Sequence, residues 1–197
     1  RWLASNSYFS ALLIILGTQM LWFFGISGGN ILMDSVSDIP AAAAAGINSG
    51  IFTKTFFDTF VYLGGAGATM GLLFATLFIA GKTNNKRLAK ISFLPGIFNI
   101  NEPIVYGLPI IFNPYCFIPF FLSPVVLCIT SALAITWGWV PAVTRPIAWT
   151  TPIFLSGYLG TSSVAGVILQ AFNLGLSILI YLPFILLQER NEQRAGT

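Results

Sequence analysis

Glu102 is the residue of this sequence best suited to chemistry, because it stands alone among apolar neighbours. It is the one acidic residue between Asp58 and Glu189, and the stretch from Phe93 to Gly107 around it is apolar and interrupted by prolines. A carboxylate in such a segment is costly to bury and generally marks a functional site. It can accept a proton from a hydroxyl group, or carry a proton across a membrane. The structural alternative is a carboxylate near the surface, or one that caps a broken helix end.

Asn99 and Asn101 add amide groups next to this carboxylate. Within four residues the chain offers amide donors, amide acceptors and a carboxylate acceptor. Sugar hydroxyls need both donors and acceptors, so this set predicts a sugar-binding site. The alternative is that the two asparagines satisfy backbone groups that are freed where a helix breaks.

Two other segments contribute candidate ligand-binding residues. The run from Leu21 to Asn30 contains Ser27 and Gly28, where a hydroxyl and a flexible backbone allow a ligand to approach closely, although glycines also simply end helices. Trp149 offers a ring that can stack on the apolar face of a sugar, or it belongs to the aromatic belt at a membrane surface. For Arg145, in the same segment, the simple interpretation is a side chain that reaches the membrane surface.

The composition excludes a soluble globular domain. Of the 197 residues 56% are apolar and 8% are charged, whereas soluble domains carry about 25% charged residues. The small net charge of +3 argues against nucleic-acid binding as a function. Because histidine is absent, nucleophiles activated by histidine and metal sites built on histidine are excluded on this chain, and no metal or cofactor is expected.

Charge-free segments show where the chain can cross a membrane. A spanning helix needs about 20 residues, but the segments 103–144 and 146–188 are 42 and 43 residues long and must hold something besides a span. Six prolines fall between Pro95 and Pro124, and each interior proline costs a helix about 3 kcal/mol and one hydrogen bond. Irregular backbone at membrane depth is tolerated only where it is buried in protein or lines a cavity.

The sequence therefore predicts an all-α polytopic membrane protein with about four to five transmembrane helices and two re-entrant or broken segments. The expected spans are residues 9–32, 58–80, 120–138 and 164–187, and the expected broken segments are 94–119 and 141–163. In the second span a Gly-x-x-x-Gly spacing favours close packing against another helix.

Basic residues indicate the orientation in the membrane. They gather between the second span and the first broken segment, and again beyond the last span: Lys82, Lys86, Arg87 and Lys90, then Arg190 and Arg194. Cytoplasmic segments are enriched in Lys and Arg, so residues 82–90 and the C-terminus are expected on the cytoplasmic side. The basic segment 82–90, interpreted as a loop, is also a plausible docking surface for a partner protein.

The residues around Glu102 form a motif. Phe-Asn-Ile-Asn-Glu-Pro-Ile-Val-Tyr-Gly over 98–107, followed by Leu-Pro-Ile-Ile-Phe-Asn-Pro over 108–114, resembles the signature of the membrane (enzyme IIC) component of the lactose/cellobiose/chitobiose family of the phosphoenolpyruvate-dependent sugar phosphotransferase system. The segments 60–69, 149–152 and 156–159 resemble further parts of that family. Its members are considerably longer and begin with a helical bundle that mediates dimerisation. This chain resembles their C-terminal, substrate-binding half.

The resemblance implies a multi-pass transporter in the lipid of the bacterial cytoplasmic membrane that binds a β-linked disaccharide of the cellobiose, lactose or diacetylchitobiose type. A phosphorylated IIB partner donates its phosphoryl group to the sugar 6-hydroxyl, which Glu102 orients and deprotonates. A homodimer is implied through the missing N-terminal half. The implied substrate-binding residues are Asn99, Asn101, Glu102, Ser27, Gly28, Trp149 and Thr150. Ser27 stands where the family usually has a histidine, so a short hydroxyl replaces a longer, chargeable contact.

A proton-coupled secondary sugar transporter is the competing class. In that class Glu102 takes up and releases a proton, and the sugar is never phosphorylated. A lone carboxylate inside the membrane suits both classes, so the residues alone do not separate them. The chemical state of the accumulated sugar separates the two classes, because the sugar is phosphorylated in one and unmodified in the other.

Overall fold

The computed structural model describes residues 8–26, 32, 36, 50–79, 83–108, 110 and 113–195, and this part of the chain forms helices and no strand. The helices are α1 Tyr8–Phe23, α4 Lys54–Phe56, the π-helical turn η1 Phe57–Val61, the 3-10 turn η2 Ala66–Ala68, α5 Thr69–Ile79, α6 Thr83–Ile97, α7 Glu102–Gly107, α8 Pro114–Thr136, α9 Leu155–Thr161 and α10 Val164–Ala195.

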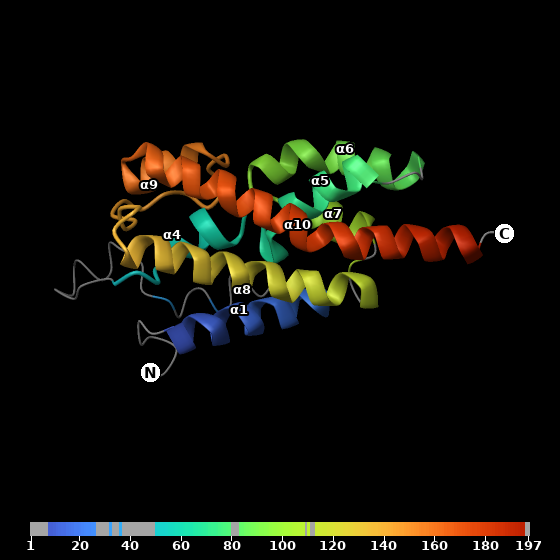
Figure 1. The fold of residues 1–197 in the computed structure, drawn as a ribbon, viewed down its shortest axis with the longest axis horizontal. Helices are drawn as coiled ribbons and strands as arrows, with labels where there is room; N and C mark the ends of the chain where they lie inside the picture. Colours follow the sequence, from blue (N-terminus) through green and yellow to red (C-terminus); the bar gives the residue numbers. More distant parts are fainter. Residues whose placement is uncertain are drawn as a thin grey trace.

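Within the described residues, three segments are long and apolar enough to cross a membrane: Lys54–Ile79, Tyr115–Thr136 and Val164–Asn191. α1 is a shorter apolar helix of 16 residues. α8 and α10 pack side by side, and α1 lies along another side of α8 (Figure 1). The predicted fold class, an all-α polytopic membrane protein with broken segments, is confirmed.

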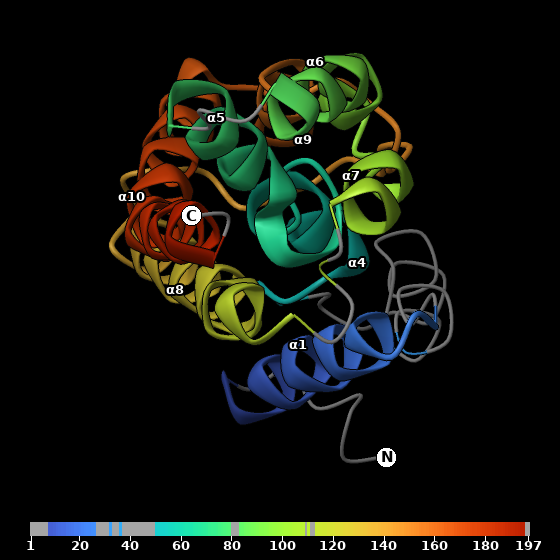
Figure 2. The same cartoon turned by 90° about the vertical axis from the view of Figure 1, so that its right-hand side faces the viewer.

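The segment Lys54–Ile79 is broken in its middle. The π-helical turn ends at Val61, and the chain then passes through Gly64, Gly65 and Gly67, with φ of 81°, 100° and 79°, before α5 begins. Glycine adopts positive φ at little cost, which other residues do not. Figure 2 shows the part of this segment before the break, around α4, at the centre of a ring of helices to which α5 belongs. The prediction of one span over 58–80 therefore missed a break, and residues 64–68 are called the glycine loop below.

Aromatic side chains fix the segment before the break in the core. Phe56, Phe57 and Phe60 are fully buried, as is Leu63 just beyond them. The rings of Phe56 and Phe57 meet edge to face with centroids 5.5 Å apart, an arrangement that aromatic pairs favour. Burial of this many large apolar groups holds η1 at the centre of the molecule.

α10 supplies hydrogen bonds that the broken helix cannot make for itself. Four fully buried polar residues, three or four positions apart, lie along one side of α10 and are called the polar row: Gln170, Asn173, Ser177 and Tyr181. They donate, at 2.7 to 3.0 Å, to the carbonyl oxygens of Thr59, Phe60, Ala68 and Gly67, respectively. A buried carbonyl without a partner costs about 1–3 kcal/mol, so the polar row stabilises the break.

Prolines interrupt the chain less than the sequence predicts. Much of the expected broken segment 94–119 is helical, because α7 lies within it and α8 already begins at Pro114. The Asn113 side chain accepts a hydrogen bond from the backbone N–H of Tyr115 and so caps α8. Pro119 and Pro124 lie inside α8. Each removes one hydrogen bond from a helix that keeps its others.

Two further boundaries differ from those predicted. The basic residues Lys86, Arg87 and Lys90 lie on the helix α6, where a loop was predicted. α10 continues to Ala195, beyond the expected end at 187. In the second broken segment, residues 141–154 are irregular as expected, and α9 follows them.

Candidate functional site

The turn between α6 and α7 carries the predicted site residues. α6 ends at Ile97, and backbone hydrogen bonds close the turn that follows. Asn99 has a φ of 61°, in the left-handed region that asparagine tolerates better than most residues. Pro103 lies in the first turn of α7, where its missing N–H leaves no helical bond unmade. The chain thus reverses, and Glu102 becomes the first residue of α7.

Asn99 joins three irregular segments. Its side-chain oxygen accepts a hydrogen bond from the Gly64 N–H at 2.9 Å. Its side-chain nitrogen donates to the carbonyl of Trp149 at 2.8 Å, and at 3.5 Å to that of Thr151. The side chain is buried. The amide therefore satisfies backbone groups, as the structural alternative expected, and its direct contact with a sugar stays a prediction.

Asn101 fits closely against the glycine loop. Its side-chain nitrogen donates to the Ala66 carbonyl at 3.1 Å, and the residue is buried. A Cβ atom added to Gly65 would lie 2.6 Å from the Asn101 Cγ. Because no larger residue than glycine fits here, the loop and the Asn99–Asn101 turn form one packed unit.

Glu102 differs from its two neighbours because it is exposed. Its carboxylate is free to meet a ligand, while the buried amide of Asn101 beside it fixes the backbone. Tyr106, one helical turn further along α7, lies on the same side of the helix. Its hydroxyl donates to the Gly25 carbonyl at 3.4 Å, which brings the end of α1 close to α7. Ser27 and Gly28, predicted from that end, lie outside the described residues.

Trp149 and Thr150 belong to a tight turn that Asn99 holds. The Thr151 N–H donates to the Ala148 carbonyl at 2.9 Å, and the Trp149 carbonyl accepts from Asn99. The Trp149 side chain is half exposed, and Thr150 is partly buried. An exposed indole on a fixed turn can stack on the apolar face of a sugar ring. The structure therefore joins the Trp149 turn to the Glu102 turn through one buried amide.

This arrangement suits a neutral, hydroxylated ligand. It presents one exposed carboxylate that can accept a proton from a hydroxyl and one exposed aromatic ring, both carried on backbone that buried amides hold in place. Within the described ranges, no three residues among His, Cys, Asp and Glu come together in a way that could hold a metal ion.

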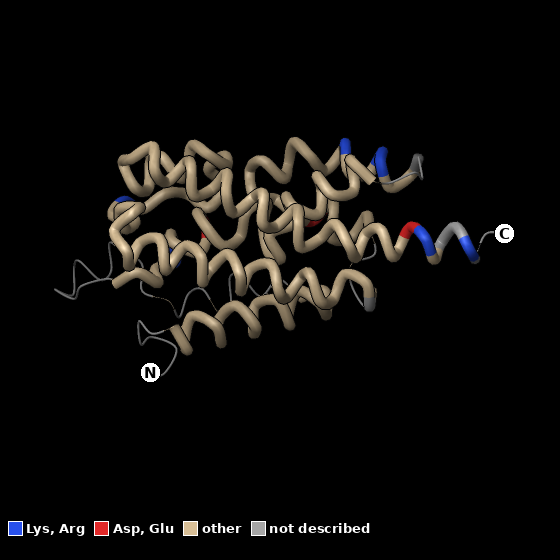
Figure 3. The backbone as a smooth tube through the Cα atoms, in the orientation of Figure 1, with Lys and Arg blue, Asp and Glu red and all other residues tan. Residues whose placement is uncertain are grey.

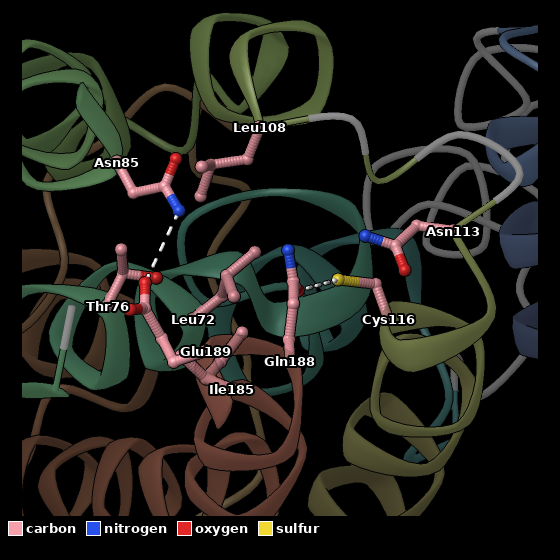
Figure 4. Close-up of a pocket in the computed structure, with 9 residues that line it drawn as sticks. All are labelled: Leu72, Thr76, Asn85, Leu108, Asn113, Cys116, Ile185, Gln188 and Glu189. Atoms are coloured by element: carbon pink, nitrogen blue, oxygen red, sulfur yellow. Dashed lines mark hydrogen bonds between the residues drawn. The ribbon is translucent and has the colours of Figure 1, made fainter. Parts of the chain in front are cut away.

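A second polar cluster lies where α5, α6, α8 and α10 meet, and Leu108 at the end of α7 also lines it (Figure 4). Glu189 of α10 is buried, and one of its oxygens accepts a hydrogen bond from the Asn85 side chain at 3.4 Å. Its other oxygen has no partner in the described part of the chain, nor has the buried hydroxyl of Thr76, which lines the same small pocket. A buried carboxylate oxygen without a partner is destabilising.

We expect Glu189→Gln to raise the thermal stability of the protein. The substitution keeps the oxygen that accepts from Asn85 and puts an amide N–H₂ where the unpartnered oxygen was, and that amide can donate to Thr76. Relieving an unsatisfied buried acceptor is worth about 1–3 kcal/mol. The measurement is the unfolding temperature in detergent. Glu102→Gln is the control, because it alters an exposed carboxylate; an equal rise in both variants would contradict the explanation.

Sequence reasoning missed the glycine loop and the polar row as parts of the site. Asn99 and Asn101 form hydrogen bonds with the glycine loop, and Ser177 and Tyr181 of the polar row also bind it. A signal was present, because Gln170, Asn173 and Ser177 are polar residues with helical spacing inside an otherwise apolar segment.

Comparisons with known proteins show the family of this chain. The family model "Phosphotransferase system, EIIC" matches residues 2–124. The chain is 35% identical over 88% of its length to the oligo-beta-mannoside-specific EIIC component of Bacillus subtilis, of which it spans 42%. It is 37% identical over 95% of its length to the cellobiose-specific EIIC component of Geobacillus stearothermophilus, of which it spans 44%. A lactose-specific EIICB component of Lacticaseibacillus casei is 32% identical over 92% of the chain, which spans 33% of that protein.

A solved structure shares the fold. The transporter ChbC, the IIC component from the N,N'-diacetylchitobiose-specific phosphotransferase system, superposes with a TM-score of 0.87 at 37% sequence identity. The match covers 97% of this chain and 47% of ChbC. The chain thus spans less than half the length of each of these relatives.

Proposed function

Because this chain belongs to the EIIC family of the phosphotransferase system, we propose that it is the substrate-binding, C-terminal half of a sugar-translocating subunit. The sugar is a β-linked disaccharide of the cellobiose, lactose or diacetylchitobiose type. The subunit binds it and presents its 6-hydroxyl to a phosphorylated IIB partner. The relatives and the solved structure that support this substrate class carry such sugars in their names.

The observation that carries the proposal is the exposed carboxylate of Glu102 at the start of α7, next to the buried Asn101. Phosphoryl transfer depends mainly on the positioning of the attacking hydroxyl and on electrostatics. Glu102 accepts the proton of the sugar 6-hydroxyl while the oxygen of that hydroxyl attacks phosphorus. The new P–O bond forms, the P–S bond to a cysteine of IIB breaks, and the thiolate leaves.

The site residues divide the remaining work. The Trp149 ring stacks on the sugar, and Thr150, Ser27 and Gly28 are further substrate contacts. The side-chain amides of Asn99 and Asn101 hold the backbone through the hydrogen bonds described above. Their remaining acceptor capacity is offered to the sugar. No cofactor is required, because the phosphoryl group arrives on the partner.

We place residues 82–90 and the C-terminus on the cytoplasmic side of a bacterial cytoplasmic membrane. The basic residues of α6 and of the last turns of α10 lie at the same end of the molecule (Figure 3). Positive charge at one end of a membrane protein favours the cytoplasmic side. The same basic end is the surface on which IIB docks, and the complete subunit forms a homodimer.

The test is the chemical state of the sugar that accumulates. We expect membrane vesicles that carry the complete subunit, given phosphoenolpyruvate and the soluble partners, to convert labelled cellobiose, lactose or diacetylchitobiose to the 6-phosphate. Phosphorylation is expected because the exposed carboxylate of Glu102 can accept the proton of the sugar hydroxyl. Vesicles without phosphoenolpyruvate are the control. Accumulation of unmodified sugar in response to a proton gradient would replace this proposal with a proton-coupled transporter.

A further inference from the structure

Three successive carbonyl groups of the glycine loop are held by three different side chains. The Ala66 carbonyl accepts from Asn101 at 3.1 Å, on the side of the sugar site. The next carbonyl, of Gly67, accepts from the Tyr181 hydroxyl at 2.7 Å, and that of Ala68 accepts from the Ser177 hydroxyl at 3.0 Å. The loop is therefore fastened between the Glu102 turn and α10.

The bonds from α10 are set in a rigid frame. Tyr181 and Ser177 are fully buried, so water does not compete for their hydroxyls. Ser177 also accepts from Ser123 of α8 at 2.9 Å and packs directly on Gly71 of α5. The hydroxyls of Tyr181 and Ser177 therefore fasten the glycine loop to α10 through the Gly67 and Ala68 carbonyls.

The same helix also holds the other half of the site. Gln170 accepts from the backbone N–H groups of Phe154 and Gly157 at 2.8 and 3.0 Å. It donates to the Thr59 carbonyl at 2.7 Å and to the Ser156 hydroxyl at 2.8 Å. α10 therefore fixes both the segment that leads into the glycine loop and the segment that follows the Trp149 turn. Asn99 links the two segments, because it accepts from the Gly64 N–H and donates to the Trp149 carbonyl.

We propose that Tyr181 and Ser177 are positioning residues of the sugar site. Neither touches the proposed substrate. They hold the Gly67 and Ala68 carbonyls, the glycine loop in turn holds Asn101, and Asn101 fixes the backbone of Glu102. This inference rests on the proposed function, since it assigns roles within the same site. It extends the site to α10, whose residues Tyr181 and Ser177 lie about 80 positions from Glu102 along the chain.

Tyr181→Phe in the complete subunit tests the proposal, because it keeps the ring and removes the hydroxyl. We expect kcat for sugar phosphorylation to fall about tenfold, since small misplacements of a catalytic group are costly. The Kd for sugar should change less than about threefold, because the Trp149 turn is held by other bonds. Tyr115→Phe is the matched control: it removes an exposed hydroxyl that accepts from Asn191 at 2.8 Å, and its kcat should equal that of the wild type.

The wild-type assay comes first and separates two kinds of failure. If the wild type forms no sugar phosphate, the proposed function falls and this inference falls with it. If the wild type is active and Tyr181→Phe has the same kcat per folded molecule, the inference alone is overturned, even if less folded protein is recovered. Should Tyr181→Phe fail to fold, Ser177→Ala provides the test. We expect its kcat to fall about threefold, and an unchanged kcat would overturn the inference.

Discussion

Glu102→Gln in the complete subunit is expected to lower the rate of sugar phosphorylation by about 10²–10⁴-fold, the usual contribution of a general base. The amide is nearly the same size as the carboxylate but does not take up the hydroxyl proton. Because Glu102 is exposed at the start of α7 and the Asn101 beside it is buried, the substitution leaves the turn intact. The measurements are kcat for phosphoryl transfer and Kd for the sugar, and the Kd should change little.

Glu189→Gln serves as the control for this prediction. It removes a buried carboxylate from a pocket whose lining does not include Asn99, Asn101 or Glu102, and it should retain phosphorylation. A Glu102→Gln variant that phosphorylates sugar at the wild-type rate would show that the proton goes elsewhere. A variant that binds sugar more weakly while its kcat stays at the wild-type value would make Glu102 a binding residue only.

Glu102 could be singled out as a candidate because its signal is local, although its exposure at the start of a helix matches the structural alternative and not the buried carboxylate that the apolar segment indicates. The turn at Asn99–Asn101 depends on residues within a few positions, namely an asparagine that tolerates positive φ and a proline in the first turn of α7. The sequence also shows directly that Glu102 is the one acidic residue of an apolar segment. Local sequence therefore determined both the turn and the residue that it exposes.

The break in the central helix was not predictable in the same way. Its carbonyl groups are satisfied by Tyr181 and Ser177, which lie 114 and 109 positions from their partners. A charge-free segment with glycines is compatible with a continuous helix packed closely against another, and Gly71 does pack that way against Ser177. Only the three-dimensional pairing shows that the glycines before Gly71 form a loop.

Pro119 misled the prediction for a related reason, because it was assigned to the broken segment 94–119. Each proline costs a helix one hydrogen bond, but the energy of burying the whole of α8 is not visible in a local argument. The fully buried Phe120 and Leu127 show how much apolar surface α8 contributes to the core. Packing therefore outweighed local propensity, and the helix starts at Pro114.

Gly65→Ala is expected to abolish sugar binding and to lower the unfolding temperature. Gly65 has φ 100° and ψ −171°, a region that is essentially restricted to glycine and that costs other residues about 1–3 kcal/mol. The added Cβ would also lie 2.6 Å from the Asn101 Cγ and 2.9 Å from the Asn99 carbonyl oxygen. Both asparagines must then move, and with them the Trp149 turn that Asn99 holds. Sugar Kd and unfolding temperature are measured on the complete subunit.

Gly138→Ala separates the two causes of this loss. Gly138 also has a positive φ, of 75°, but a Cβ added there meets no atom within 4 Å. It therefore carries the cost of backbone strain without a collision, and we expect a lower unfolding temperature with an unchanged Kd for sugar. If Gly65→Ala behaved like Gly138→Ala, with sugar binding intact, the glycine loop would be only structural. Loss of binding in Gly65→Ala alone would require that the loop sets the position of the residues that contact the sugar.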